Sequence, residues 1–196
     1  MTPLVHVIDG NPGLRDSLRS LLESDELAVA TYSDAADFLE HYVPEQPGCL
    51  LLDVRIPGTS GLHLQDELMK RGIRIPTVFI TAHGDVAMAV AAARKGALDV
   101  VEKPFDDEAL IRRVRGALIG DAIARDATRR LSLLSAREIE VLERVVEGKP
   151  NEVIAEELGI AVKAIAFHRK RIMHKLQVRT VPDLIRFIAR HRISDR

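Results

Sequence analysis

The sequence predicts a protein of two domains: a doubly wound α/β domain with a five-stranded parallel sheet, followed by a small all-α domain. Short apolar runs alternate with amphipathic stretches over the first 120 residues, and this alternation then stops. The charge changes as well, since residues 1–120 carry 12 Lys and Arg against 18 Asp and Glu, whereas residues 131–196 carry 13 against 9. An acidic region before a basic one predicts different partners, with nucleic acid a candidate for the second.

Composition excludes several classes of protein. With 46% hydrophobic and 29% charged residues, the 196-residue chain is typical of globular proteins. No apolar run approaches the roughly 20 residues of a membrane-spanning helix, and the first residues do not resemble a secretory signal peptide. The single cysteine, Cys49, excludes an internal disulfide and is expected to be a small buried residue. We therefore expect a cytoplasmic protein with no membrane partner.

Five short apolar runs are expected to be strands. Two of them, Cys49–Asp53 and Pro76–Thr81, lack polar alternation, which is typical of strands buried on both faces of a parallel sheet. The others are Leu4–Asp9, Leu27–Tyr32 and Leu98–Glu102.

Amphipathic stretches between these runs are expected to be helices. Leucines form stripes over Leu14–Leu22 and Leu62–Leu68, and a further helix is expected from about Asp106. The segment Val86–Lys95 is rich in alanine, and Gly96 would suit its C-terminal cap. Strands alternating with helices predict the doubly wound fold.

Polar residues stand at the carboxyl ends of the expected strands. Asp9, Asp53 and Thr81 end three of them, and Lys103 follows the fifth. Because the functional crevice of such a sheet lies at these ends, we expect the four side chains to share one site. Considered one at a time, Asp53 could be a helix cap, Thr81 a structural residue and Lys103 a solvated charge.

Three segments around these residues resemble the receiver domain of response regulators. They are 51–58 (Leu-Leu-Asp-Val-Arg-Ile-Pro-Gly), 79–82 (Phe-Ile-Thr-Ala) and 102–105 (Glu-Lys-Pro-Phe). The resemblance covers about residues 4–120 and implies a flavodoxin-like fold. It also implies that Asp53 is the phosphoacceptor, that Thr81 senses the phosphoryl group and that Lys103 pairs with it.

The same resemblance implies a Mg²⁺ site and a cis peptide bond between Lys103 and Pro104. The carboxylates of Asp9 and Asp53 and the backbone carbonyl of Arg55 would hold the ion. These residue types suit the chemistry, because a carboxylate can attack a phosphoryl group to form an acyl phosphate. The charge that develops on the phosphoryl oxygens calls for a divalent cation, an ammonium and a hydroxyl donor.

Two positions depart from the receiver pattern. Receivers usually have two acids at the end of the first strand, whereas here Gly10 follows the first acid. We therefore expect reduced Mg²⁺ affinity, with a water in the gap and Asn11 at a position that matches no required acid. Val100 replaces an aromatic residue that usually swings inward, so the readout of phosphorylation is expected to be muted. His83 is expected to be a solvent-exposed loop residue.

Four helices are expected in the basic region. Ser135 and Glu138 form a capping box that opens the first helix, which runs to about Glu147 and is ended by Gly148. The other three are expected over about Asn151–Leu158 before Gly159, Val162–Leu176, and Val181–His191.

Residues 121–131 are polar, and they could prolong the preceding helix or serve as a linker. We expect the domains to cover residues 1–120 and 132–196, with the linker between them.

The third helix of the basic region is the candidate reader of nucleic acid. The segment from Ala161 to Arg179 contains no acid and six cations, namely Lys163, Arg169, Lys170, Arg171, Lys175 and Arg179. Nearly all of 133–190 resembles the four-helix LuxR-type domain of FixJ/NarL-class regulators. The segments that carry this resemblance are 134–138 (Leu-Ser-Ala-Arg-Glu), 154–160 (Ile-Ala-Glu-Glu-Leu-Gly-Ile), His168-Arg169, Ile172 and Lys175-Leu176.

The resemblance implies that this helix enters the major groove of DNA. By their positions, Phe167 would contact a thymine methyl group and Lys170 a guanine. The expected phosphate contacts are Lys163, Arg169 and Lys175. His168 is expected either to pack between helices or to contact DNA.

Three alanines depart from the LuxR-type pattern. Ala161, Ala164 and Ala166 stand where relatives often have polar residues, which predicts weaker DNA binding or more reliance on dimerisation and DNA shape. The fourth helix has an apolar stripe that includes Leu184 and Ile188. By resemblance, its exposed part implies a homodimer on two-fold related half-sites.

The main hypothesis is a DNA-binding transcriptional response regulator rather than an enzyme. Its partners would be a sensor histidine kinase, DNA and RNA polymerase. One alternative, motivated by Gly10 and Val100, is a receiver that acts without phosphorylation as an interaction or dimerisation module. A flavodoxin-like enzyme or nucleotide binder is disfavoured, because Gly10 and Gly13 lack the spacing of a phosphate-binding loop.

Overall fold

The computed structural model describes residues 1–82, 90, 94 and 96–192. The chain divides into two compact units, Met1–Ala122 and Ile123–Arg196. The expected loop residue His83 and most of the expected helix Val86–Lys95 lie outside the described residues. Within the described ranges, no helix combines the length and hydropathy that crossing a membrane requires.

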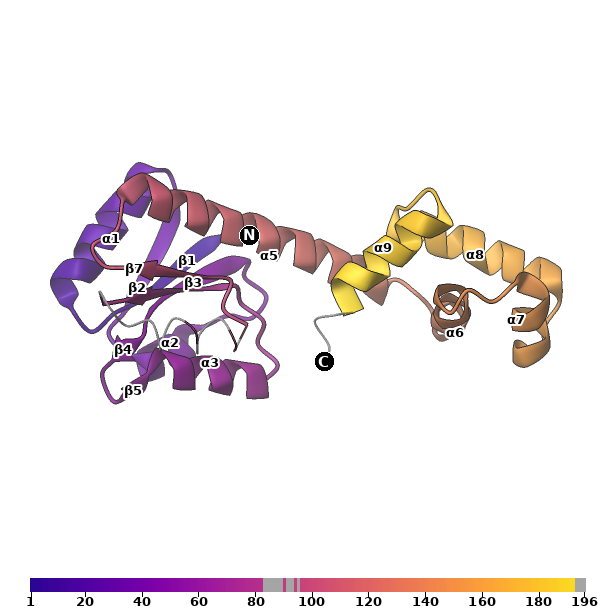
Figure 1. The fold of residues 1–196 in the computed structure, drawn as a ribbon, viewed down its shortest axis with the longest axis horizontal. Coiled ribbons are helices and arrows are strands. Elements are labelled where there is room, and N and C mark those ends of the chain that lie inside the picture. The colour runs from indigo at the N-terminus through magenta and orange to yellow at the C-terminus, as the bar shows by residue number, and fades with distance from the viewer. Residues whose placement is uncertain (83–89, 91–93, 95, 193–196) are drawn as a thin grey trace. The chain divides into compact units, whose positions relative to one another are not determined.

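A parallel sheet of five strands in the order β2-β1-β3-β6-β7 forms the centre of the first unit (Figure 1). The strands are β1 (Leu4–Ile8), β2 (Ala28–Tyr32), β3 (Gly48–Asp53), β6 (Thr77–Thr81) and β7 (Asp99–Glu102). They correspond to the five runs predicted from the sequence, so the doubly wound fold is confirmed. The parallel register pairs Ile8 with Leu52 and Thr81 with Glu102, which brings the carboxyl ends of the strands to one edge.

Helices cover both faces of this sheet (Figure 1). On one face, α1 (Pro12–Ser24) and α5 (Asp107–Ser132) pack against a core that includes Leu18, Leu51 and Val114. On the other, α2 (Ala35–His41) and α3 (Gly61–Lys70) contribute Phe38 and Leu64 to a core that also includes Leu52 and Phe79 of the sheet. Cys49 is fully buried, as expected.

Helix α5 continues past the receiver-like unit without interruption. It spans 26 residues, Asp107–Ser132, and therefore contains the segment 121–131 that was expected to be either helix or linker. A hydrogen bond attaches the middle of the helix to β3, because the carboxylate of Asp121 accepts a hydrogen bond of 2.9 Å from the backbone N–H of Gly48. Arg115 also pairs with Asp25 at 2.6 Å. The expected linker is thus helical.

Two features of the first unit were not specified by the sequence pattern. Helix α2 is only seven residues long, and Asp34 caps it by accepting a hydrogen bond from the backbone of Asp37. The short strands β4 (Arg55–Ile56) and β5 (Thr59–Ser60) form an antiparallel pair just after Asp53. Gly58, with a φ of 77°, allows the tight turn between them.

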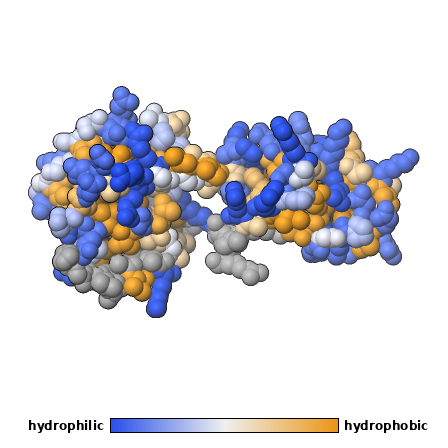
Figure 2. All heavy atoms as spheres, turned by 45° about the horizontal axis from the view of Figure 1, so that its top comes forward, coloured by the Kyte–Doolittle hydropathy of each residue, from blue (hydrophilic) through white to orange (hydrophobic). Residues whose placement is uncertain are grey.

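The second unit consists of helices around their own core. They are α6 (Ala136–Val146), α7 (Asn151–Leu158), α8 (Val162–Leu176) and α9 (Val181–Arg192). The predicted bounds of α7 and α8 are confirmed, as is the capping box of Ser135 and Glu138. The core includes Val141, Ile154, Ile165, Ile172 and Leu184. Hydrophilic residues project over much of the visible surface of both units (Figure 2).

Candidate functional site

The four polar residues predicted at the sheet edge lie where the strands bring them together. Asp9 directly follows β1, Asp53 ends β3, Thr81 ends β6 and Lys103 follows β7. The Lys103 ammonium donates hydrogen bonds to the Asp53 carboxylate at 2.5 Å and to the Asp9 carboxylate at 3.0 Å. The structure thus assembles two acids and a cation, and the positive charge of Lys103 is shared between the two carboxylates.

Backbone donors hold the second oxygen of each carboxylate. The N–H of Arg55 donates to Asp53 Oδ1 and that of Asn11 donates to Asp9 Oδ1, each at 2.8 Å. Burial raises the pKa of Asp53, and its neighbour Asp9 raises it further, while Lys103 acts in the opposite direction. For Lys103, burial lowers the pKa, but the bonds to both carboxylates outweigh this effect and the pKa is raised. Lys103 therefore stays charged at neutral pH.

Thr81 presents an unused hydrogen-bonding group at the same edge. The residue is 3% exposed, and its hydroxyl has no hydrogen-bond partner among the described residues. Because a buried hydroxyl without a partner costs free energy, such a group suits a ligand that supplies the missing acceptor. The Lys103–Pro104 peptide bond is cis, as the receiver resemblance implied.

The oxygen ligands available for a Mg²⁺ ion are fewer than the receiver pattern provides. Gly10 has no side chain, and a Cβ atom built on it would lie 2.9 Å from the ring of Pro57. The side chain of Asn11 is engaged as the N-cap of α1. Asp9, Asp53 and the carbonyl of Arg55 remain, and they fit a Mg²⁺ ion that keeps several of its waters. Among the described residues, no three His, Cys, Asp or Glu side chains form a metal-binding group.

Val100 lies on β7, the last strand of the sheet. Its partly buried side chain packs against the core on the α2 and α3 side. A valine is too short to swing between an inward and an outward position as an aromatic side chain can. This placement is compatible with the muted readout expected from the sequence, which stays a prediction.

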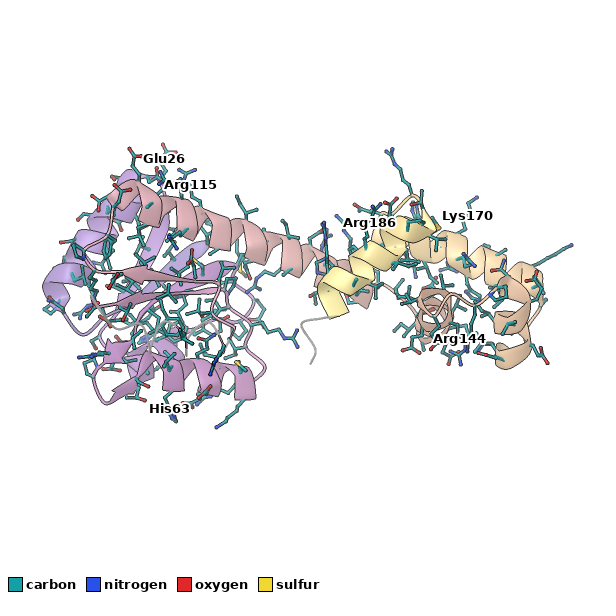
Figure 3. All side chains as sticks on the ribbon, in the orientation of Figure 1. Glu26, His63, Arg115, Arg144, Lys170 and Arg186 are labelled. Carbon is teal, nitrogen blue, oxygen red and sulfur yellow. The ribbon has the colours of Figure 1, made fainter. Side chains whose placement is uncertain are left out.

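In the second unit, α8 presents both a ring and cations to solvent. Phe167 is 58% exposed, and the Arg171 guanidinium lies 5.6 Å from the centre of its ring. Lys163 and Lys170 are exposed, and neither makes an ion pair with the residues that the structure describes. Lys170 stands on the face of α8 that points away from α6, the helix that carries Arg144 (Figure 3). A hollow of about 400 Å³ on this helix is lined by Phe167, Lys170, Arg171, His174 and Lys175.

Other predicted DNA contacts are engaged within the protein. Arg169 donates a 2.7 Å hydrogen bond to the side chain of Asn151, and Lys175 donates one of 2.6 Å to Glu138. His168 is partly buried, and its Nδ1 has no hydrogen-bond partner among the described residues. The predicted set therefore divides into exposed groups and groups that already have protein partners.

Arg171 was not among the residues assigned to the DNA surface from the sequence. It follows Phe167 by four residues, the helical spacing at which side chains meet, so the pattern contained the signal for this pair. The cation also stacks on the ring at a distance typical of a cation–π contact.

Comparisons with known proteins agree with this two-part architecture. The family model for the response regulator receiver domain matches residues 5–115, and that for bacterial regulatory proteins of the luxR family matches residues 132–188. The transcriptional regulatory protein FixJ of Azorhizobium caulinodans is 43% identical over 189 residues, which cover 93% of this chain and 90% of that protein. The C4-dicarboxylate transport transcriptional regulatory protein DctR of Rhodobacter capsulatus is 40% identical over 195 residues, with 95% and 99% covered.

Solved structures give the same result. Full-length FixJ from B. japonicum superposes with a TM-score of 0.59 at 34% identity, covering 98% of this chain and 99% of that one. The response regulator StyR superposes with a TM-score of 0.62 at 41% identity, covering 97% and 100%. Both domains and their order are therefore shared along almost the whole chain. The chain belongs to the response regulators that join a receiver domain to a LuxR-type DNA-binding domain.

Proposed function

We propose that Asp53 is the phosphoacceptor of this DNA-binding response regulator and that a partner histidine kinase supplies the phosphoryl group. The observation that carries this proposal is the Lys103 ammonium, which lies within hydrogen-bond distance of both Asp53 and Asp9. The buried hydroxyl of Thr81 at the same edge, which has no hydrogen-bond partner among the described residues, supports it.

In the transfer, an oxygen of the Asp53 carboxylate attacks the phosphorus of a phosphohistidine on the kinase. The new O–P bond forms as the P–N bond breaks, and the histidine nitrogen leaves with the electron pair of that bond. Lys103 can pair with a phosphoryl oxygen, and the Thr81 hydroxyl can donate a hydrogen bond to another. The added charge would then bias the segments that follow β6 and β7.

We propose Asp9, Asp53 and the backbone carbonyl of Arg55 as the Mg²⁺ ligands. When bound, the ion would offset negative charge on the phosphoryl oxygens. Gly10 supplies no carboxylate, so waters must complete the coordination and the affinity is expected to be low.

For DNA, we propose that α8 enters the major groove with Phe167 and Lys170 at base edges. The exposure of both side chains supports this role, since a ring can contact a thymine methyl group and an ammonium can donate to guanine. Lys163 is the strongest candidate for a phosphate contact because no protein acid pairs with it in the described structure. Arg169, which donates a hydrogen bond to Asn151 of α7, and the partly buried His168 would orient the helix or reach the backbone of DNA.

The proposed regulator acts by binding rather than by turning over a substrate, and it works in the cytoplasm, where DNA and kinase are both accessible. A homodimer would place two α8 helices in two half-sites, and exposed apolar residues of α9 such as Ile185, which is 41% exposed, are available for that contact. Promoter-bound dimers could then contact RNA polymerase.

The phosphoacceptor can be identified by treating the protein with acetyl phosphate and Mg²⁺ and measuring its intact mass. We expect a mass increase of one phosphoryl group in the wild type, located on Asp53 by peptide mapping, and no increase in Asp53→Asn. A modified residue elsewhere, or an unmodified wild type, would contradict the proposal.

A receiver that works without phosphorylation is the second candidate, and the closed space at Gly10 favours it. The single substitution Gly10→Asp would place a Cβ atom too close to the ring of Pro57. The appropriate test is therefore the double variant Gly10→Asp/Pro57→Ala, with Pro57→Ala as its control. Faster labelling in the double variant, together with slow labelling of the wild type, would favour this candidate. Equal labelling rates would exclude Gly10 as the limiting feature.

A further inference from the structure

The ends of α5 and α8 are joined by two crossed hydrogen bonds. The Arg130 guanidinium of α5 donates to the backbone carbonyl of Leu176, the last residue of α8, at 3.2 Å. In return, the Lys175 ammonium of α8 donates to the backbone carbonyl of Leu133, just after the end of α5, at 2.9 Å. Each helix thus supplies a cation to the terminal carbonyls of the other.

These carbonyls are groups that need a partner. The last carbonyls of a helix have no donor within it and carry the negative end of the helix dipole. Lysine and arginine are therefore suitable partners. Arg130 is also held by an ion pair with Asp126 of its own helix, which fixes the guanidinium near the end of α8.

A buried acid anchors the second bond. Glu138 of α6 is 1% exposed. Its carboxylate forms ion pairs with the Lys175 ammonium at 2.6 Å and with the Arg171 guanidinium at 3.2 Å. Burial would raise the pKa of Glu138, but the hydrogen bonds from Lys175 and Ser135 outweigh it and the pKa is lowered. A charged Glu138 that lost Lys175 would be a buried acid with much weaker compensation, so the pair is costly to separate. The Lys175 ammonium is thus held within the protein by two acceptors, the carbonyl of Leu133 and the carboxylate of Glu138.

We propose that Arg130 and Lys175 form a clasp that positions the DNA-reading helix α8 against the end of α5, and that Lys175 is a positioning residue rather than a phosphate contact. The inference rests on the proposed DNA binding by α8. The residues of the clasp all lie in the second unit, since Arg130 stands in the part of α5 that follows Ala122.

The test uses the full chain and a DNA duplex enriched from a random-sequence library by the wild-type protein. Binding is measured by fluorescence anisotropy over a series of salt concentrations. Lys163→Met is the reference for a phosphate contact, and we expect weaker binding with a salt slope reduced by about one. If no duplex is enriched by the wild type, the proposed function fails, and this outcome is distinct from a failure of the clasp.

For the clasp, we expect Lys175→Met and Arg130→Met each to weaken binding about tenfold while the salt slope stays near that of the wild type. For Glu138→Gln, the two roles of Lys175 predict changes in DNA affinity of opposite sign. If Lys175 served phosphates, removing the acid would free the ammonium and tighten binding. The clasp instead predicts weaker binding, because its anchor is lost.

The double variant Arg130→Met/Lys175→Met provides a second measurement. Two bonds that act as one unit predict a loss clearly smaller than the product of the two single losses. Thermal unfolding confirms that each variant is folded, and Arg130→Met carries the prediction alone if a Lys175 variant does not fold. A salt slope reduced by about one in Lys175→Met, tighter binding by Glu138→Gln, or independent losses in the double variant would overturn the proposal.

Discussion

The polar cluster at the sheet edge and the exposed face of α8 arrange their charges in opposite ways. At the sheet edge, Lys103 bonds to both Asp9 and Asp53, so opposite charges face one another before any partner arrives. On α8, Lys163 and Lys170 are exposed and have no acid partner in the described structure. A site that receives a single phosphoryl group needs its charges held in place, whereas a surface for a polyanion needs cations that are free to release counterions.

The same distinction divides α8 along its own length. Toward its C-terminal end, Arg171 and Lys175 both approach the buried Glu138. Sequence alone makes these cations look equivalent to Lys163 and Lys170. Their partners show that Arg171 and Lys175 fasten this end of the helix to α6, whereas Lys163 and Lys170 are exposed to solvent.

The largest expected effect comes from breaking the charge pairing of the receiver. Lys103→Met leaves Asp9 and Asp53 close together without their cation, and we expect it to destabilise the folded protein by about 3 kcal/mol at neutral pH. Urea unfolding measures this change, with Lys70→Met, an exposed lysine of α3, as the control. Equal stabilities for the two variants would mean that Lys103 does not hold the carboxylates.

A buried group without a charged partner provides the contrasting case. Burial lowers the pKa of His6 from 6.5 to about 4, and its Nδ1 lies 3.0 Å from the Tyr32 hydroxyl. Because the folded pKa lies below the unfolded value, stability is fully present above pH 6.5 and is lost as the pH falls toward 4. Between pH 7 and pH 5 the loss is expected to be about 2 kcal/mol.

The variant His6→Phe keeps an aromatic ring beside Tyr32 and Phe38 but cannot titrate. Urea unfolding over this pH range should show a smaller loss of stability in the variant than in the wild type. Parallel pH profiles for the two proteins would show that His6 is not protonated on unfolding.

The exposed ring of Phe167 on α8 carries no charge, so its contribution to DNA binding can be separated from that of the cations. Phe167→Ala removes an apolar contact but no cation, so we expect DNA affinity to fall about tenfold with an unchanged salt slope. Lys163→Ala should lower the slope by about one at a similar loss of affinity. Anisotropy titrations of both variants distinguish these roles, and a reduced slope for Phe167→Ala would contradict them.

The smallest expected effect concerns the end of α8. Gln177 has a φ of 55°, a left-handed conformation that costs a residue with a side chain about 1 kcal/mol. We expect Gln177→Gly to raise the free energy of unfolding by about 0.5 kcal/mol, since the more flexible unfolded chain offsets part of the gain. A lower stability in thermal unfolding would show that the glutamine side chain makes a compensating contact.

Much of the architecture could be predicted because local patterns determine it. The apolar runs located the strands, Gly159 located the end of α7, and the predicted bounds of α8 agree with the observed ones. The meeting of Asp9, Asp53, Thr81 and Lys103 followed from one rule about the carboxyl ends of parallel strands. The short helix α2 lacked such a pattern, because only Phe38 within it is buried.

The partners of individual side chains could not be predicted in the same way. Lys175 lies 37 residues from Glu138, and only the packing of α6 on α8 brings them together. The ring of Pro57 beside Gly10 is likewise a contact between distant segments. Residue type and spacing therefore predicted the polar cluster at the sheet edge and the bounds of α8, but assigning a partner to each charge required the fold.

We propose that a phosphoryl group on Asp53 changes how α8 binds DNA. The direct measurement is the affinity for the enriched duplex before and after treatment with acetyl phosphate and Mg²⁺, in the wild type and in Asp53→Asn. We predict that affinity changes at least several-fold in the wild type, in step with labelling, and stays constant in the variant. A fully labelled wild type with unchanged affinity, or an equal change in Asp53→Asn, would contradict the claim.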